Sequence, residues 1–265
     1  MLKDITLGQY FPGDTVVHRL DPRTKLIAVV IYIVALFQAK SWLSYAAVLA
    51  AAVILMAVSK ISAKNIFKGL KPMLIIISLT ALLNIFYTQG TPVVPGWIIT
   101  WEGIDRAAKM MLRITLLITG TFLLTYTTSP LALTDGLEML MNPLKKLKVP
   151  VHEMTMMMSM ALRFIPTLTE ETDKIMSAQK ARGADFETGG LIKRAKALVP
   201  ILVPLFVSAF RRADDLAVAM ESRCYHGGEG RTRMKQLIMI RQDHIALLVS
   251  VLFLAGVIAV RNLGG

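Results

Sequence analysis

The chain has 265 residues, and its 30 lysine and arginine residues against 18 acidic residues give a formal net charge of +12. Hydrophobic residues make up 54% of the chain and its mean hydropathy is +0.56, whereas about 45–50% apolar residues is usual in a soluble domain. The composition therefore excludes an ordinary soluble domain and predicts an all-α integral membrane protein.

The sequence lacks the common motifs of catalysis and of metal binding. Its single cysteine, Cys224, excludes an internal disulfide and zinc sites built on several cysteines. The four histidines have no pair at the helical spacing that a metal needs. There is no phosphate-binding P-loop, no G-x-S-x-G and no H-E-x-x-H. We therefore expect no catalytic residue, no metal site, no bound cofactor and no ATP site on this chain.

Five apolar runs are candidates for membrane spans, each of which takes about 20 residues. They cover residues 26–37, 42–58, 72–87, 110–126 and 245–260. The first run is short and crosses only if Arg23 and Lys25 extend to the interface at one end. Asp21 is a good N-cap and Pro22 a good first helical residue, so the first helix should begin there. The helix cap and a basic membrane flank explain most of residues 18–25, but they do not explain His18 and Arg19.

The distribution of basic residues predicts the orientation of these spans. Four lysines lie between the second and third runs, whereas residues 88–103 contain tryptophans and prolines but no lysine or arginine. By the positive-inside rule, the N-terminus, the lysine segment and residues 128–243 lie in the cytoplasm. Arg113 opposes this rule because it falls inside the fourth run. We interpret it as pairing with a helix C-terminus or a carbonyl group, with a functional role as the alternative.

These patterns divide the chain into three parts. Residues 1–127 form the N-terminal segment and the first four spans, residues 128–243 form a cytoplasmic domain of amphipathic helices, and residues 244–265 form the last span. The cytoplasmic domain is expected to hold a short helix at 131–141 and two long amphipathic segments. Five methionines crowd residues 154–160. We interpret them as packing, with an adaptable sliding surface as the alternative.

Each long amphipathic segment ends in an arginine between small residues, Ala181-Arg182-Gly183 in the first and Ser222-Arg223-Cys224 in the second. Apolar residues at intervals of seven lead to each arginine. A helix macrodipole by itself favours an arginine at a C-terminus. It does not explain two such arginines in line with an apolar stripe. Because a guanidinium can bind a carboxylate bidentately, two such ends predict two similar sockets on a pair of related subunits.

The paired triplets, together with residues 18–27, 162–186 and 209–226, resemble the transmembrane T component of energy-coupling factor (ECF) transporters of the shared-module type. The resemblance covers nearly the whole chain. It implies that Arg182 and Arg223, each with its two flanking residues, dock into grooves of two ATPase subunits. The amphipathic segments would then be coupling helices, and ATP with Mg²⁺ would bind to the partners.

The resemblance further implies a scaffold for vitamin uptake in a prokaryotic cell membrane. Besides the ATPase subunits, its partners would be a substrate-binding S component and membrane lipid, with no nucleic acid. Hydrolysis would move the coupling helices and topple the S component, which releases its cargo. A T component of a dedicated cobalt or nickel importer is the alternative within the family. A self-contained secondary carrier is the alternative outside it, although the spans contain few ionisable residues.

Overall fold

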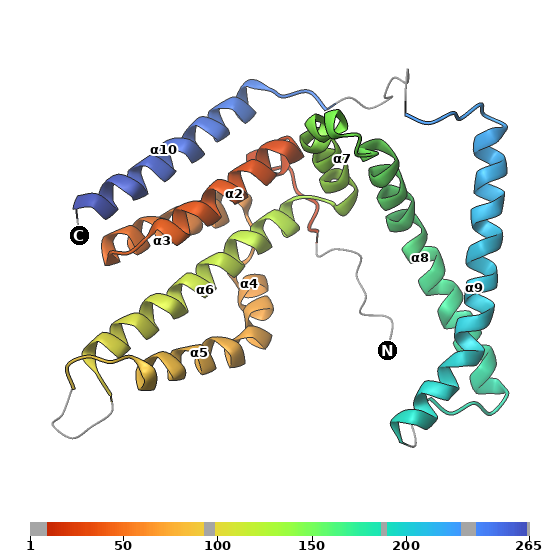
Figure 1. The fold of residues 1–265 in the computed structure, drawn as a ribbon, viewed down its shortest axis with the longest axis horizontal. Coiled ribbons are helices and arrows are strands. Elements are labelled where there is room, and N and C mark those ends of the chain that lie inside the picture. The colour runs from red at the N-terminus through yellow and green to blue at the C-terminus, as the bar shows by residue number, and fades with distance from the viewer. Residues whose placement is uncertain (1–9, 93–98, 187–189, 229–236, 264–265) are drawn as a thin grey trace. The chain divides into compact units, whose positions relative to one another are not determined.

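The computed structural model describes residues 10–92, 99–186, 190–228 and 237–263, which are mainly helical (Figure 1). Part of the expected outer loop, at 93–98, and part of the basic segment before the last span, at 229–236, lie outside these residues. The chain divides into two compact units. One contains residues 141–236 and the other contains residues 8–140 and 237–265, and each is described by itself.

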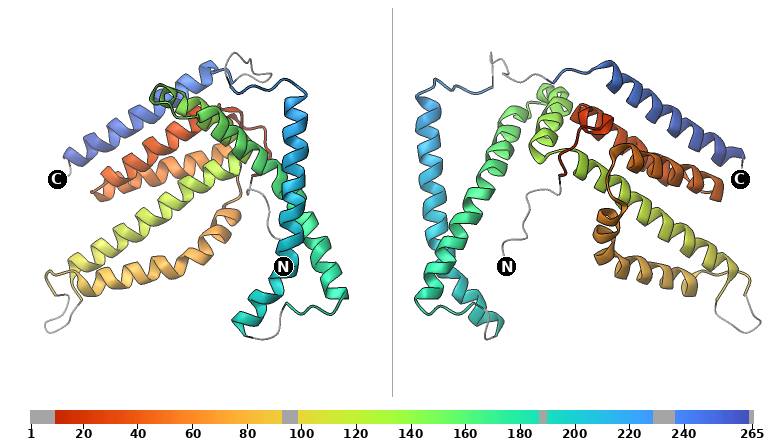
Figure 2. Two further views of the ribbon diagram at one scale, coloured as in Figure 1. Left: turned by 45° about the vertical axis from the view of Figure 1, so that its right-hand side comes forward. Right: turned by 180° about the vertical axis from the view of Figure 1, so that it is seen from behind.

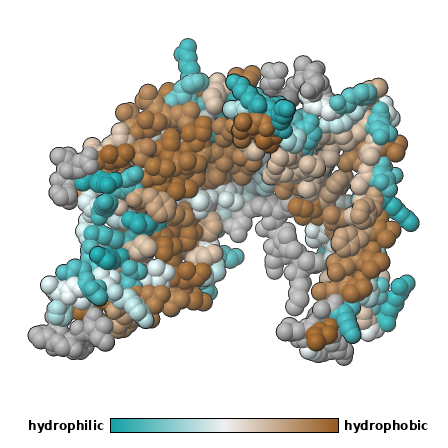
Figure 3. Space-filling view, in the orientation of Figure 1, coloured by the Kyte–Doolittle hydropathy of each residue, from teal (hydrophilic) through white to brown (hydrophobic). Residues whose placement is uncertain are grey.

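Four helical segments of the second unit are long and apolar enough to cross a membrane. They are Trp42–Ser59, Ala63–Tyr87, Trp101–Thr127 and Arg241–Arg261. They correspond to helix α3 (Trp42–Ser59), to α4 (Ala63–Leu70) with α5 (Leu74–Tyr87), to α6 (Trp101–Thr127) and to α10 (Arg241–Leu263). Apolar side chains gather on the surface formed by α10 and its neighbours (Figure 3). The all-α membrane class expected from composition is confirmed for the described residues.

The fifth expected span is helix α2 (Pro22–Gln38), whose 17 residues are at the short end of the length that can cross a membrane. It begins at Pro22 with Asp21 as N-cap, as expected, and the Asp21 carboxylate accepts a hydrogen bond from the Arg23 amide. Helix α2 packs along α10. The Asp21 amide donates to Asp243 at one end, and Arg261 donates to Gln38 at the other. Because α10 is long enough to span, its short neighbour reaches a similar depth.

Most of the lysine segment between the second and third spans is helical. Helix α4 (Ala63–Leu70) is continued by the short 3₁₀ helix η1 (Lys71–Met73) into α5 (Leu74–Tyr87). Its apolar side is covered because Ile66 and Leu70 are buried in a cluster with Tyr126 of α6. Lys64 and Lys68 therefore occupy the polar face of an amphipathic helix.

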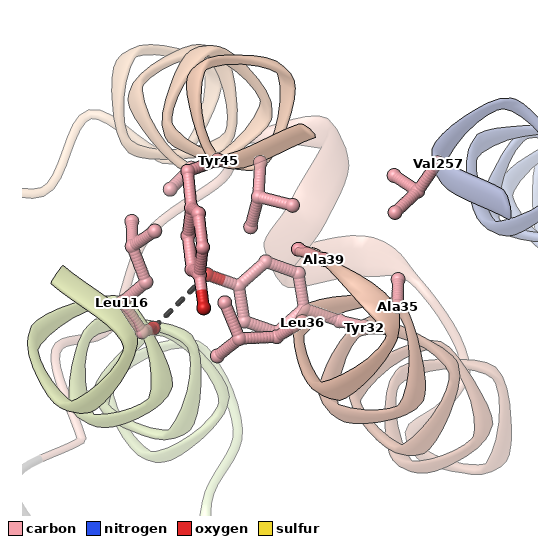
Figure 4. Packing of buried hydrophobic residues seen from close by; sticks show 9 residues of the cluster. Tyr32, Ala35, Leu36, Ala39, Tyr45, Leu116 and Val257 are labelled. Atoms are coloured by element: carbon pink, nitrogen blue, oxygen red, sulfur yellow. Dashed lines mark hydrogen bonds between the residues drawn. The ribbon is translucent and has the colours of Figure 1, made fainter. Parts of the chain in front are cut away.

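The main core lies where α2, α3, α6 and α10 meet (Figure 4). Tyr32 of α2 fits against Gly120 of α6, where a Cβ atom would collide with the ring. Its hydroxyl donates to the Leu116 carbonyl oxygen at 2.9 Å. Leu36 and Tyr45 complete the contact between α2 and α3 and are almost fully buried. A glycine and a satisfied tyrosine thus let α6 approach the first span closely.

Arg113 of α6 is held inside this bundle by groups from two other helices. Its side chain donates to the Tyr45 hydroxyl at 2.9 Å and to the Ala39 carbonyl oxygen at 3.3 Å. Ala39 is the C-cap of α2, where the helix macrodipole is negative. The interpretation of Arg113 as a partner of a helix C-terminus is confirmed by this geometry.

The expected boundaries between the membrane helices and the cytoplasmic domain, at 127/128 and 243/244, stay a prediction. The compact units change at 140/141 and at 236/237. The difference at the first boundary is helix α7 (Pro130–Met141), which lies with the membrane helices because Gly136 packs closely on Pro22. Helix α1 (Val16–Arg19) belongs to the same unit and packs against α3.

The other unit consists of a 3₁₀ helix, η2 (Asn142–Leu147), and two helices of 31 residues each, α8 (Val151–Ala181) and α9 (Leu191–Glu221). Helices α8 and α9 cross, and their C-terminal ends lie at opposite ends of the cross (Figure 2). Pro166 lies inside α8, and Pro200 and Pro204 lie inside α9. Helix α9 begins at Leu191, before both of its prolines. Helices α8 and α9 are called the two arms below.

Candidate functional site: two arginine-capped helix ends

The first arginine triplet forms a regular helix stop at the end of α8. Arg182 is the C-cap, with φ −85° and ψ 6°, and Gly183 follows in the left-handed region at φ +85°. The Gly183 amide donates to the Lys180 carbonyl oxygen at 3.0 Å, and the Ala184 amide donates to that of Gln179 at 3.0 Å. This pair of bonds is the Schellman motif, which satisfies the last carbonyl groups of a helix.

The second triplet forms the same stop at the end of α9. Ser222 is still helical at φ −63° and ψ −20°, and Cys224 has φ +55°. The Cys224 amide donates to the Glu221 carbonyl oxygen at 2.9 Å, and the Tyr225 amide donates to that of Met220 at 3.0 Å. By this bonding pattern, Arg223 holds the position in the second stop that Arg182 holds in the first.

The two stops differ in the residue that takes the left-handed conformation. In the first it is Gly183, which has no Cβ to oppose a positive φ. In the second it is Cys224, a residue for which this conformation costs about 1–2 kcal/mol. The sequence identified both triplets by their small flanking residues. It did not reveal that the residue after each arginine reverses the backbone.

Both arginine side chains are available to a partner. Arg182 and Arg223 are exposed, and neither guanidinium makes an ion pair or side-chain hydrogen bond within the described parts of the chain. The flanking Ala181, Ser222 and Cys224 are exposed as well. Each triplet therefore presents a free guanidinium between small side chains at the tip of a helix.

A contact between α8 and α9 lies at matching positions of the two arms. Arg212 donates to Glu171 at 3.1 Å. Glu171 lies eleven residues before Arg182, and Arg212 lies eleven residues before Arg223. At 1.5 Å per residue, each arginine is about 16 Å along its helix from this contact. The arms are therefore held at equivalent points, a long-range pairing that sequence reasoning missed.

Glu171 is also contacted by a hydroxyl group of α9. A hydrogen bond from Ser208 lowers the pKa of the Glu171 carboxyl group, and the charge of Arg212 lowers it further. Glu171 therefore carries its negative charge at neutral pH, as the contact with Arg212 requires.

The methionine run is largely exposed, so its interpretation as internal packing is wrong for three of the five residues. Met154, Met157 and Met158 are 41%, 62% and 43% exposed. Helix α9 likewise exposes large apolar residues, including Phe206 at 61% and Phe210 at 69%. Both arms thus carry apolar surface that the other residues of their own unit leave uncovered.

The residues around His18, which the sequence left unexplained, belong to a connection between the ends of several helices. His18 lies near Thr15 Oγ1 and the Phe11 carbonyl oxygen, at 2.6 and 3.1 Å. Its own carbonyl oxygen accepts from Lys25 Nζ at 3.0 Å, and the same ammonium group donates to the Thr127 carbonyl oxygen at 2.9 Å. Residues 18–25 therefore join the start of α2 to the end of α6.

The chain is similar to known transport proteins over most of its length. A family profile described as cobalt transport protein (CbiQ) matches residues 13–234. The chain is 56% identical over 252 residues to the "energy-coupling factor transporter transmembrane protein EcfT" of Clostridium kluyveri, which covers 94% of this chain and 93% of that protein. Identity to the protein of the same name from Bacillus subtilis is 47% over 261 residues, or 97% of this chain and 98% of the relative.

Proposed function

The chain belongs to the family of energy-coupling factor transporter transmembrane proteins, the T components, and from this premise we propose that it couples ATP hydrolysis by two ATPase subunits to release of substrate from an S component. It is a membrane protein and part of a transporter with partner subunits. The observation that carries the proposal is the equivalence of its two helix ends. Arg182 and Arg223 end crossed arms in the same backbone geometry, and both guanidinium groups are free.

Each arginine is proposed to enter a groove on one ATPase subunit. A guanidinium group presents a planar fork of donors that binds a carboxylate bidentately and fixes its orientation. The small residues beside it, such as Gly183, let the backbone come close to the groove wall. ATP and Mg²⁺ bind to the ATPase subunits in this scheme, and this chain transmits the movement.

The arms are proposed to pass this movement to the S component through their apolar surfaces. The exposed methionines of α8 suit a contact that changes, because an unbranched thioether side chain adapts to different neighbours. The contact between Glu171 and Arg212 holds the arms at matching points, so a displacement of one helix end is passed to the other arm.

We propose that the cargo is a vitamin and that several S components use this chain in turn. The family profile is described by cobalt transport, so a dedicated metal-ion importer is the second candidate. The similarity to proteins named for the energy-coupling factor favours the shared module. In a prokaryotic cell membrane, the N-terminus and the arms would lie in the cytoplasm, consistent with the basic residues on that side.

The docking proposal is tested by charge reversal at the helix ends. The double variant Arg182→Glu, Arg223→Glu is compared with a matched control, Arg163→Glu, Arg211→Glu, which reverses one exposed arginine on each arm away from its end. Co-purification of ATPase subunits from membranes and vitamin uptake by cells are measured for both.

We expect the double variant to insert normally and to lose both the ATPase subunits and uptake, while the control retains them. Loss in both variants to the same extent would mean that general charge, and not the helix ends, holds the complex. Uptake by the purified chain alone in vesicles would instead identify a secondary carrier. Arg182→Lys should also impair coupling, because an ammonium group cannot form the bidentate contact.

A further inference from the structure

The membrane unit contains an apolar cavity that neither the arms nor the arginine triplets use. It has a volume of about 620 Å³ and is lined by α2, α3, α6 and α10, with α1 at one end. This volume is within the range of about 300–1,000 Å³ that is usual for small-molecule sites. All of its lining residues belong to the same compact unit.

The cavity is polar at one end and mainly apolar along the rest of its length, where the hydroxyl groups of Tyr32 and Ser250 donate to carbonyl oxygens of the helices. The polar groups lie where α2 and α10 begin and where α3 and α6 end, the side that is expected to face the cytoplasm; they are Thr24, Lys25, Ser59, Thr127 and Gln242. Apolar residues continue from there along the helices, for example Ala246, Val249 and Phe253 on one face of α10. From Gln242 to Phe253 this face extends about 16 Å along the helix.

Two groups at the polar end have hydrogen-bond donors to offer. The Thr24 side chain is fully buried at 0% exposure, and its hydroxyl group has no hydrogen-bond partner among the described residues. A buried hydroxyl group without a partner is costly and points to an acceptor that completes the site. Lys25, 6% exposed, donates to two carbonyl oxygens and has three N–H groups.

We propose that this cavity binds one phospholipid of the surrounding bilayer, with an acyl chain along the apolar part and ester or phosphate oxygens at Thr24 and Lys25. The match is one of polarity, since the cavity and the lipid each have one polar end and a long apolar remainder. Water is a poor occupant of an apolar cavity because it needs two to four polar partners. At membrane depth, an acyl chain is the abundant apolar molecule that can enter between the helices.

The charges near the polar end are compatible with a phosphate or ester group. Asp243 uses its two carboxylate oxygens for the backbone amides of Asp21 and Ile240, at 2.8 Å each. Asp21 accepts two hydrogen bonds from the Arg23 side chain, at 3.0 and 2.8 Å. Both acids thus already have donors, and the Thr24 hydroxyl group remains for an oxygen of the lipid.

The proposal is tested by filling the cavity. In Ala246→Phe a ring replaces a methyl group that lines the cavity, whereas Ala255→Phe makes the same change at an exposed position of the same helix. The complex is purified from membranes, detergent is exchanged until phospholipid per complex is constant, and the remainder is measured by phosphorus analysis and mass spectrometry. A phospholipid with a photoactivatable acyl chain is used in parallel, and its adducts are mapped.

We expect the wild type and Ala255→Phe to retain phospholipid and to give adducts at Val249 or Phe253, and Ala246→Phe to lose both several-fold. Thr24→Val keeps the shape of the side chain and provides a second variant if Ala246→Phe fails to fold. It should insert normally and retain less phospholipid. Equal retention and equal adducts in all four proteins would overturn the proposal, as would adducts found only on the exposed face of α10.

Discussion

Gly183→Ala probes the backbone of the first helix stop without a change of charge. No atom lies within 4 Å of the position that the new Cβ would take, so the substitution causes no clash within this unit. Its cost comes from the φ of +85°, which is worth about 1–2 kcal/mol for a residue with a Cβ. Loss of glycine freedom in the unfolded chain returns about 0.4–1 kcal/mol. The helix stop should therefore be destabilised by about 1 kcal/mol, which lowers the equilibrium constant between its closed and open forms roughly fivefold.

Cys224→Gly is the matched change at the second stop, with the opposite sign. Relief of the positive φ at Cys224 should exceed the entropy lost, so this stop should be stabilised by up to about 1 kcal/mol. Hydrogen exchange reports the two stops separately, through the Ala184 amide in the first and the Tyr225 amide in the second. Affinity for the ATPase subunits is measured in the same preparations.

Exchange at Ala184 should become about fivefold faster in Gly183→Ala, with weaker ATPase binding, while exchange at Tyr225 slows in Cys224→Gly. Unchanged exchange in Gly183→Ala would refute the argument from backbone strain. If Cys224→Gly instead weakens ATPase binding as much as Gly183→Ala does, the cysteine side chain itself contributes to docking. The shared backbone geometry of the two stops would then not determine the affinity for the ATPase subunits.

Three further predictions concern contacts inside each unit. Removal of either Glu171 or Arg212 should reduce uptake, and a double-mutant cycle on uptake should show coupling between them, whereas additive effects would disprove the contact. Because the pKa of Glu171 is lowered, the contact should persist at neutral pH and be lost only as pH falls through that lowered value. Tyr45→Phe should lower the thermal stability of the membrane unit by about 1 kcal/mol, since Arg113 loses one of its two partners, and no change in melting would contradict this. Asp243→Ala should cost about 2–3 kcal/mol in an unfolding titration, because the buried amide of Asp21 and the part-buried amide of Ile240 lose a charged acceptor. A clearly smaller cost would mean that water replaces the carboxylate.

Sequence patterns predicted the class of fold, the start of the first span at Pro22 and the pairing of Arg113, since each depends on local chemistry or on a strong penalty for a charge at membrane depth. They also located both arginine triplets. Periodicity could not show that the residues after Arg182 and Arg223 reverse the backbone alike, because one is glycine and the other is cysteine.

Local sequence patterns could not predict the contacts between distant segments. The pair Glu171 and Arg212 resembles any two charges on solvated helices until α8 and α9 are seen to cross. Nothing in the local sequence before the last span indicates that the Asp243 carboxylate binds the backbone at the start of the first span. The exposed methionines were misinterpreted for a related reason. Composition indicates that a residue is apolar but does not indicate whether its neighbour is in the same chain or in a partner.

The hydrogen bond between Asp21 and Asp243 joins residues 222 positions apart, which has a consequence for biosynthesis. Helix α2, the first span to leave the ribosome, cannot bury its side toward α10 until the last helix has been made. Such distant contacts delay the completion of a fold. Until then α2 must rest against α3, α6 or lipid, with the Asp21 amide unsatisfied. A chain truncated before α10 should therefore be inserted but recognised as incomplete, so membrane proteases can remove it before it recruits partners.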